Sequence, residues 1–363
     1  MASSVTNIGV IGCGRISGHH CNSIHAIDGV ELLAVCDLIS DKAEKYSREF
    51  NVPWFKDYRR MLEEYPEINT VVVATPSGMH FEHGIEIISH YKKNIILEKP
   101  IFLRPDHVEI AYDKAEELGL KLFPVFQNRY NKAVERVKKA IVNDELGDMR
   151  IMSVRVRWCR PQRYYDLAPW RGTFSHDGGA LTNQGVHHVD LLRYLGGNID
   201  KVSSTMRTLG ASIEVEDTVV ATFTYENGAV GVLEVTTSAR PDDYEASISF
   251  VGSKGLAQIG GIAVNELQIF TPAPESCNVY SENFSSGIGI YGNGHKKMYK
   301  DIVSSLMQDQ PFPVGREDCL NTVKLLNSFY RSDEKSVWVK VDTPELSTRL
   351  GRPNEEISKL YRN

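Results

Sequence analysis

Three polar side chains of the 363-residue chain have the spacing of one helix face. Asn183 and His187 are four residues apart, and Asp190 follows three further on. If a helix begins at Asn183, the three share a face, because residues three and four apart are neighbours on a helix. A histidine between an amide and a carboxylate that orients its imidazole is an acid/base constellation. The alternative interpretation is that His187 or His188 is a satisfied core histidine.

Lys99 is the second residue with a chemical interpretation. It follows the apolar run NIIL and stands in the sequence EKP at 98–100. A lysine at a strand end can donate a hydrogen bond to a substrate oxygen and stabilise the negative charge that develops there. The alternative is a strand-end lysine that lies in solvent.

The stretch GVIGCGRISG (9–18) predicts the turn that would bring a cofactor to these groups. It lies where a short apolar strand gives way to a helix. Gly12 permits a tight turn, Gly14 lets the backbone approach a pyrophosphate, and the helix N-terminus offers free N–H donors. The third small position is Ser17, neither glycine nor alanine. The alternative interpretation, a glycine-rich corner without a ligand, is weakened by the next strand.

That next strand, VELLAVCD, ends in Asp37, at the distance from the glycines where a carboxylate accepts the adenosine ribose hydroxyls. Its charge would repel a 2′-phosphate. Residues 38–41 supply no arginine to bind one, so the sequence favours NAD over NADP.

Strands alternate with helices through the first third of the chain. Strands are expected at 70–76, 94–100 and 120–127, and helices at 81–90 and 105–118. This alternation predicts an α/β fold with a parallel, doubly wound sheet, whose ligands lie outside the carboxyl ends of the strands. The residues that this topology places near the cofactor are Pro76, His80, Glu98, Lys99, Gln127 and Arg129.

After residue 128 the pattern changes to a large, mostly antiparallel sheet. Residues 151–158 alternate apolar and polar side chains, and 217–237 reads as a hairpin with Asn227-Gly228 at its turn. Helices at about 128–143, 184–195, 295–308 and 316–330 would cover one face. The other face would stay open for association into a dimer or tetramer. The predicted domains are 1–127, 128–345 and a tail at 346–363, with a surface excursion at 271–294.

Composition narrows the function classes. A net charge of -6 offers no general attraction for nucleic acid, and no apolar run is long enough to span a bilayer. Residues 1–7 lack the features of a secretory signal, so a cytoplasmic protein is expected. The six cysteines include no Cys-x-x-Cys pair and are expected to be reduced thiols. The close histidine pairs have no third ligand at a known spacing, so no metal is expected.

Taken together, the glycine turn with Asp37, ATPSGMH (74–80), EKP (98–100) and GGALTNQGVHHVDLL (178–192) resemble the Gfo/Idh/MocA oxidoreductases. The resemblance covers nearly the whole chain. It implies a Rossmann domain, an α/β domain with an open sheet, and oxidation of a sugar or cyclitol hydroxyl by a nicotinamide cofactor. Lys99 and His187 stand at the catalytic positions of the family. Asn183 stands where the family usually has aspartate.

Within that family, QNRYNKAV (127–134), RPQRYYD (160–166), WRGT (170–173) and RLGRPNEEISKLYR (349–362) are similar to the WlbA/WbpB-type nucleotide-sugar 3-dehydrogenases. This resemblance implies NAD-dependent oxidation of carbon-3 of UDP-N-acetylglucosaminuronic acid before a transamination. The alternatives are a UDP-N-acetylglucosamine 3-dehydrogenase, a free-sugar or inositol dehydrogenase, and a non-catalytic NAD-binding regulator. A sensor would not need the acid/base pair.

Two sets of binding residues follow. Arg129, Arg155, Arg157, Arg160 and Arg163 could form the basic cluster that a diphosphate and a uronate require, although Arg155 and Arg157 could equally form a solvated strand face. The expected cofactor contacts are Gly12, Gly14, Arg15, Ile16, Asp37, Thr75, Pro76, His80, Glu98, Lys99, Gln127, Trp170 and Arg171. The expected substrate contacts are Lys99, Arg129, Tyr130, Asn131, Arg160, Arg163, Tyr164, Asn183 and His187.

Overall fold

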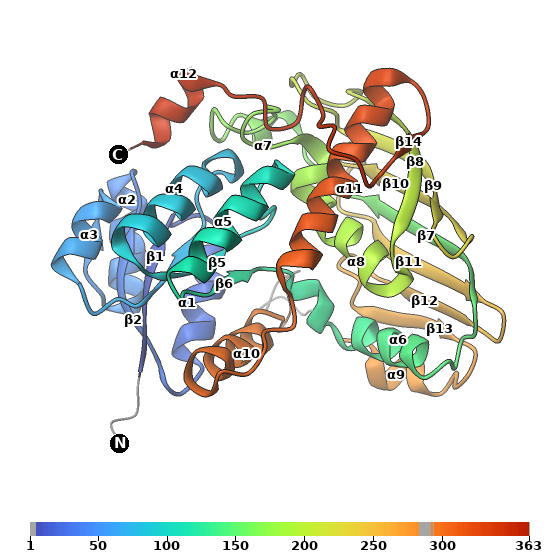
Figure 1. Cartoon of the computed structure of the whole chain (residues 1–363), viewed down its shortest axis with the longest axis horizontal. Coiled ribbons are helices and arrows are strands. Elements are labelled where there is room, and N and C mark those ends of the chain that lie inside the picture. The colour runs from blue at the N-terminus through green and yellow to red at the C-terminus, as the bar shows by residue number, and fades with distance from the viewer. Residues whose placement is uncertain (1–4, 283–291, 293, 363) are drawn as a thin grey trace. The chain divides into compact units, whose positions relative to one another are not determined.

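The computed structural model describes residues 5–282, 292 and 294–362 (Figure 1). The chain forms two compact units. The first contains Met1–Val125, His295–Leu320 and Pro353–Asn363, and the second contains Phe126–Gly294 and Asn321–Arg352. The bounds predicted from the sequence were 1–127, 128–345 and 346–363. In the structure, residues 295–320 and 353–363 group with the first unit.

The first unit is built on a parallel sheet of six strands in the order β3-β2-β1-β4-β5-β6. This is the doubly wound sheet predicted from the alternation of strands and helices. The strands are β1 (Thr6–Ile11), β2 (Val30–Cys36), β3 (Trp54–Phe55), β4 (Thr70–Val73), β5 (Asn94–Leu97) and β6 (Leu122–Pro124). The helices are α1 (Ser17–His25), α2 (Ser40–Phe50), α3 (Tyr58–Glu64), η1 (Ser77–Met79), α4 (His80–Glu86), η2 (Ile87–Tyr91), α5 (Pro105–Glu117), α12 (Glu355–Ser358) and η6 (Lys359–Tyr361).

The helix α10 (Gly294–Gln308) belongs to this unit from His295 onward because its apolar side chains and its end are held there. Met298, Tyr299 and Ile302 are fully buried. The Lys121 ammonium donates to the Ser305 carbonyl at 2.6 Å. Sequence position alone had placed this helix over the second sheet, and that expectation was wrong.

The second unit contains an eight-stranded sheet in the order β13-β12-β11-β7-β10-β9-β8-β14. All neighbours are antiparallel except β7 and β10, which run parallel. The strands are β7 (Met149–Arg157), β8 (Ile199–Arg207), β9 (Thr218–Tyr225), β10 (Val230–Thr236), β11 (Glu245–Gly252), β12 (Leu256–Gly260), β13 (Glu266–Phe270) and β14 (Val339–Lys340). The helices are η3 (Gln127–Tyr130), α6 (Lys132–Val142), α7 (Gln162–Tyr165), η4 (Ala180–Gln184), α8 (Val186–Gly196), α9 (Ser276–Tyr280) and α11 (Arg316–Lys335), which begins in the first unit.

One face of this sheet is covered and the other is open, as predicted. Met152, Val154 and Val156 of β7 are fully buried, and the helices α6, α8 and α11 lie on one side of the strands in Figure 1. The predicted hairpin joins β9 and β10 through Asn227-Gly228. Along the strands, large apolar side chains are exposed at Ile151, Val220, Val230, Val232, Leu256 and Ile269.

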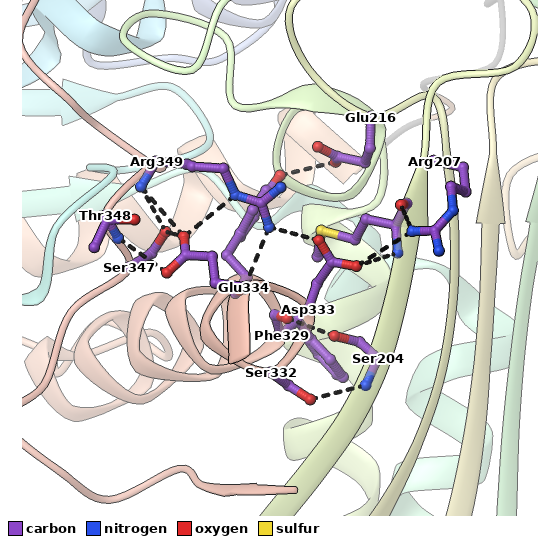
Figure 2. A network of polar contacts seen from close by, with 12 residues as sticks. Ser204, Arg207, Glu216, Phe329, Ser332, Asp333, Glu334, Ser347, Thr348 and Arg349 are labelled. Atoms are coloured by element: carbon purple, nitrogen blue, oxygen red, sulfur yellow. Dashed lines mark hydrogen bonds and ion pairs between the residues drawn. The ribbon is translucent and has the colours of Figure 1, made fainter. Parts of the chain in front are cut away.

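The chain end is fixed to α11 before it leaves the second unit (Figure 2). The Glu334 carboxylate accepts hydrogen bonds from the Ser347 hydroxyl at 2.6 Å and from the Thr348 and Arg349 amides at 3.2 Å. Arg349 also donates to Asp333 at 2.7 Å. In the first unit, Arg362 pairs with Glu82 at 2.5 Å. The tail predicted at 346–363 is therefore held by ion pairs in each unit.

The expected surface excursion is only partly visible. Residues 271–282 contain α9, and the remainder at 283–291 and 293 lies outside the described residues. In the part of the chain that is described, no helix is both long and apolar enough to cross a membrane. All six cysteines are free thiols.

Candidate active site

The glycine turn has the geometry that a pyrophosphate cradle requires. Gly12 has a φ of 93°, and a Cβ atom there would lie 2.5 Å from the Ala74 carbonyl oxygen. A Cβ atom at Gly14 would meet nothing within 4 Å, so the backbone is open to a ligand at this point. Ser17 is fully buried, and its hydroxyl donates to the Gly12 carbonyl at 2.5 Å. The serine at the third small position therefore fits because its hydroxyl closes the turn.

Asp37 lies directly against this turn. One carboxylate oxygen accepts from the Cys13 amide at 2.7 Å, and the other accepts from the Ile39 amide at 2.8 Å. The Tyr46 hydroxyl donates to the Gly14 carbonyl at 2.7 Å and fixes the other side of the loop. Asp37 is half-buried. The first two residues after Gly14 complete the turn, with the Arg15 side chain exposed and Ile16 half-buried.

His80 joins the loops that follow β4 and β5. Its Nδ1 atom lies 2.8 Å from the Pro100 carbonyl and its Nε2 atom lies 3.0 Å from the Thr75 carbonyl. Burial lowers its pKa, so the ring is neutral at physiological pH and its single N–H donates to one of the two carbonyls. Thr75 and Pro76 are half-buried at the end of β4. His80 was predicted as a cofactor contact, and its ring lies between the carbonyls of two loops that carry other predicted contacts.

Lys99 emerges at the carboxyl end of β5, where the topology predicted a ligand. It is half-buried, and its peptide bond to Pro100 is cis. Its backbone amide donates to the Glu98 carboxylate at 3.1 Å. Glu98 itself is buried and contacts His20 at 2.9 Å.

His187 lies in the second unit, in the first turn of α8. It is buried, and its Nε2 atom lies 3.1 Å from the Gln127 side-chain nitrogen. Because an amide nitrogen only donates, Nε2 accepts here and carries a lone pair. Gln127, predicted as a cofactor contact, thus orients the candidate base.

The predicted role of Asp190 was wrong, because both of its carboxylate oxygens are bound elsewhere. Arg129 donates to them at 2.8 and 2.6 Å through a two-pronged, buried ion pair, and Thr322 adds a contact at 3.4 Å. The Arg129 guanidinium also lies 4.5 Å from the Tyr194 ring. Arg129 was expected to bind substrate anions, but two of its donors are committed to Asp190.

Asn183 is oriented by its neighbours. The helix predicted at about 184–195 begins at Val186, and Asn183 lies in the π-helical turn Ala180–Gln184 before it. The Asn183 amide nitrogen donates to Asp177, and its oxygen accepts from the Gln184 side chain at 2.5 Å. The second Asp177 oxygen accepts from the Gly172 amide at 2.7 Å. A carboxylate therefore supports the asparagine that replaces the expected aspartate.

The segment 160–173 gathers cations and aromatic rings. Arg160 donates to Asp243 at 2.7 Å and to Gln184 at 3.1 Å. The Arg171 guanidinium lies 4.3 Å from the Tyr164 ring and 4.6 Å from the Trp170 ring. Its Nε atom is buried and has no hydrogen-bond partner among the described residues. An arginine held between two rings with a vacant buried donor is suited to an anionic or carbonyl ligand.

The remaining predicted substrate residues divide into two groups. Arg163 is exposed on α7, and Tyr130 is half-buried at the end of η3. Asn131 is buried, and its amide donates to the Ala263 and Val264 carbonyls at 3.0 and 3.2 Å. Its amide nitrogen is thus used within the fold, and its contact with substrate stays a prediction.

The basic cluster expected from five arginines does not form on the strand face. Arg157 of β7 pairs with Glu234 at 2.6 Å and with Glu245 at 3.3 Å. Arg155 is exposed on the same strand. These two arginines fit the alternative interpretation, a solvated sheet face.

Glu216 was missed by sequence reasoning. It is buried, and burial raises its pKa to about 8. Its Oε1 atom accepts from the Leu181 amide at 3.0 Å and lies 2.8 Å from the Tyr330 hydroxyl. A Cβ atom on Gly179, whose φ is 82°, would lie 2.2 Å from Oε2. Glu216 thus fixes the start of the segment that carries Asn183 and His187, and its position before the apolar run VVATF gave no local signal of this contact.

Comparisons with known proteins agree with this geometry. Residues 6–126 match the oxidoreductase family with the NAD-binding Rossmann fold, and residues 134–258 match the GFO/IDH/MocA C-terminal domain. The chain therefore belongs to the Gfo/Idh/MocA family. It is an NAD-dependent oxidoreductase of the sugar-dehydrogenase type.

Two solved structures are similar over almost the whole chain. The WlbA dehydrogenase from Bordetella pertussis, in complex with NADH and UDP-GlcNAcA, is 33% identical, with a TM-score of 0.87 over 94% of this chain and 99% of that one. The WlbA dehydrogenase from Chromobacterium violaceum, in complex with the same two ligands, is 30% identical, with a TM-score of 0.85 over 94% and 97%. Myo-inositol 2-dehydrogenase of Thermotoga maritima is 27% identical over 92% of this chain and 98% of its own length.

Proposed function

We propose that this protein oxidises the carbon-3 hydroxyl of UDP-N-acetyl-D-glucosaminuronic acid and gives the 3-keto sugar for a later transamination. The observation that carries the proposal is the similarity, over 94% of the chain, to two WlbA dehydrogenases solved with NADH and UDP-GlcNAcA. The inositol dehydrogenase relative is less identical to this chain. The preserved Lys99 and His187 favour an enzyme over an NAD-binding regulator.

NAD, when bound, supplies the acceptor for the hydride that leaves carbon-3. The residues present fit this cofactor, because Gly14 leaves the backbone open and Asp37 lies against the turn. With Asp37 accepting the ribose hydroxyls, its charge opposes the 2′-phosphate of NADP. Trp170 and Arg171 are proposed as further cofactor contacts.

His187 is the proposed general base. Its Nε2 lone pair accepts from the Gln127 amide in the observed arrangement, so the substrate hydroxyl would take the place of that amide before Nε2 accepts its proton. Lys99 is proposed to donate a hydrogen bond to the same oxygen while it becomes a carbonyl. Asn183, held by Asp177, is proposed as a substrate contact rather than a proton carrier.

We assign the binding of the negatively charged groups of the substrate to the segment 160–173. Arg163 is exposed and has no ion pair in the described parts of the chain, whereas Arg160 is partly neutralised by Asp243. Arg163 is therefore the residue we propose for the uronate or the diphosphate, with Arg160 and Tyr164 beside it. Arg129 is paired with Asp190, so it is not among the arginines that we propose for binding the substrate anions.

A single-turnover comparison tests the substrate. The protein saturated with NAD is mixed with UDP-N-acetylglucosaminuronic acid or with UDP-N-acetylglucosamine, which lacks the carboxylate, and the absorbance of NADH is followed. The uronate should react at least about 10-fold faster, because a site built for an anion is left unpaired by the neutral sugar. Arg163→Met should reduce this preference.

The comparison also decides between the alternatives. Equal or faster oxidation of the neutral sugar would move the assignment to a UDP-N-acetylglucosamine 3-dehydrogenase. Failure of both nucleotide sugars together with oxidation of myo-inositol would favour the second candidate, for which the Thermotoga maritima relative is the supporting observation.

We further infer that copies of the chain associate through the open face of the second sheet. The exposed apolar side chains of β7, β9, β10, β12 and β13 support this inference. A monomeric protein rarely exposes so many neighbouring apolar residues.

A further inference from the structure

The first unit contains a buried polar cluster that the proposed function has not used. His20 comes from α1, Glu98 from the end of β5, and His295 from the first turn of α10. Their exposed fractions are 0%, 5% and 2%. Tyr299 follows His295 by one helical turn and is fully buried. Four polar side chains from three distant parts of the chain therefore meet without solvent.

Glu98 is the centre of this cluster. His20 Nε2 lies 2.9 Å from Glu98 Oε1, and His295 Nε2 lies 3.8 Å from the same oxygen. His20 Nδ1 lies 2.8 Å from the Tyr299 hydroxyl, so both nitrogens of that ring are engaged. The other carboxylate oxygen, Oε2, accepts from the Lys99 backbone amide at 3.1 Å. The carboxylate thus connects the two histidines on one side with the lysine backbone on the other.

The charge state follows from the same contacts. Burial by itself would raise the pKa of Glu98, but the hydrogen bond from His20 and the nearby His295 ring, whose Nε2 atom lies 3.8 Å away, lower it well below its usual range. Burial lowers the pKa of His295, which is therefore neutral. An ionised carboxylate is a strong acceptor for the Lys99 amide, since hydrogen bonds to charged groups are about twice as strong as neutral ones.

We propose that Glu98, clamped by His20 and His295, is a positioning residue that fixes the backbone from which Lys99 reaches its substrate. This inference rests on the proposed role of Lys99. His20 lies on the helix that begins directly after the glycine turn, so the clamp also ties the cofactor cradle to the lysine. An error of about 1 Å in such a group can cost roughly 100-fold in rate.

The same three side chains could hold a metal ion, because their nearest ligand atoms all lie within 4.8 Å of one another. The hydrogen-bond account is favoured, because His20 and Glu98 already contact each other at 2.9 Å and Tyr299 completes the chain. Metal analysis of the purified protein is therefore one arm of the test.

A double-mutant cycle tests whether Glu98 acts through Lys99. Hydride transfer is measured in single turnovers at saturating NAD for the wild type, Glu98→Gln, Lys99→Ala and the double variant. Glu98→Gln should slow the wild type by roughly 10-fold or more. In the Lys99→Ala background the same change should cost less than about 2-fold, because residues that act as one unit are not additive.

A second readout does not depend on turnover. In Glu98→Gln the Lys99 amide should exchange its hydrogen at least about 10-fold faster, because its charged acceptor is lost. Glu86→Gln is the matched control. It makes the same chemical change in the same unit, at a carboxylate held by Tyr58 and Arg59 at 2.8 and 2.6 Å. It should leave both the hydride-transfer rate and the Lys99 amide unchanged.

A pair of histidine variants checks the clamp itself. His20→Gln keeps a donor for Glu98 and should retain most of the rate, whereas His20→Ala should match Glu98→Gln. Equal losses in the two histidine variants would contradict the clamp.

The outcomes separate this inference from the proposed function. A normal hydride-transfer rate in Lys99→Ala would show that the lysine has no role in this step, and it would overturn the inference as well. A slow Lys99→Ala with an additive effect of Glu98→Gln would overturn the inference alone. If the wild type does not oxidise the UDP-sugar, an unchanged Lys99 amide in Glu98→Gln overturns the inference. Stoichiometric zinc that is lost in Glu98→Gln would mark a metal site and overturn it as well.

Discussion

Glu216 is expected to make the protein less stable as pH rises from about 5 to about 8. Burial raises its pKa to about 8 in the folded protein, whereas a free glutamate has a value of 4.5. The hydrogen bonds give an independent reason for a bound proton. The Tyr330 hydroxyl has a single hydrogen, but the Gly178 carbonyl and Glu216 Oε1 both lie within its reach. A proton on Oε1 lets Glu216 donate to Tyr330 while Tyr330 donates to Gly178.

The sign and size of the effect follow by linkage. Between pH 4.5 and about 8 the unfolded chain has lost this proton and the folded protein keeps it, so the free energy of unfolding falls with rising pH. The limiting slope is about 1.4 kcal/mol per pH unit, which sets an upper bound of about 5 kcal/mol over the whole interval. Relaxation of the buried site reduces this bound, and we expect about 1–3 kcal/mol.

Urea unfolding of the wild type and Glu216→Gln at pH 5, 6.5 and 8 measures this difference. The variant loses one hydrogen bond and should be about 1 kcal/mol less stable at pH 5. The difference in free energy of unfolding between the wild type and Glu216→Gln should shrink as pH rises and reverse by pH 8, because glutamine does not titrate. Glu234→Gln is the control, because the hydrogen bond from Arg157 lowers the pKa of Glu234. This variant should still lose stability between pH 5 and 8 as the wild type does. Parallel pH profiles for the wild type and Glu216→Gln would refute the reasoning.

Three further predictions concern function. Asp37→Ala should narrow the preference for NAD over NADP by at least about 10-fold in dissociation constant, and a wild type that binds both equally would contradict the assignment. Lys99→Ala and His187→Ala should each slow single-turnover hydride transfer by roughly 100-fold or more with NAD binding nearly intact, and Asn183→Ala should be milder. A near-normal rate for His187→Ala would remove it as the base. Val232→Glu on the open sheet face should shift the mass in light scattering toward a monomer, and an unchanged mass would place the interface elsewhere.

The first unit could be predicted closely because its signals are local. The glycine turn, the carboxylate at the end of the second strand and the alternation of strands with helices each occupy a short stretch of sequence. Even Ser17, which departs from the usual pattern, is explained within the turn by its bond to the Gly12 carbonyl. The strand ends also predicted that Lys99 follows the carboxyl end of a strand, which is where β5 leaves it.

The contacts of the second unit were harder to predict because they join distant segments. Helical spacing indicated which residues near His187 could share a face, but not that Gln127 would meet the ring or that Arg129 would take Asp190. In the first unit, the return of His295 to Glu98 was hidden for the same reason. Spacing predicts a face, and only the fold determines what packs against it.

The central claim is that hydride leaves carbon-3 of UDP-N-acetylglucosaminuronic acid for NAD. UDP-N-acetylglucosaminuronic acid that carries deuterium only at carbon-3 is mixed with the NAD-saturated protein, and the nicotinamide product of one turnover is weighed by mass spectrometry. The account predicts NADH that has gained one mass unit, formed more slowly than from the unlabelled sugar. Unlabelled NADH would show that another carbon is oxidised, and the absence of any NADH would contradict the substrate itself.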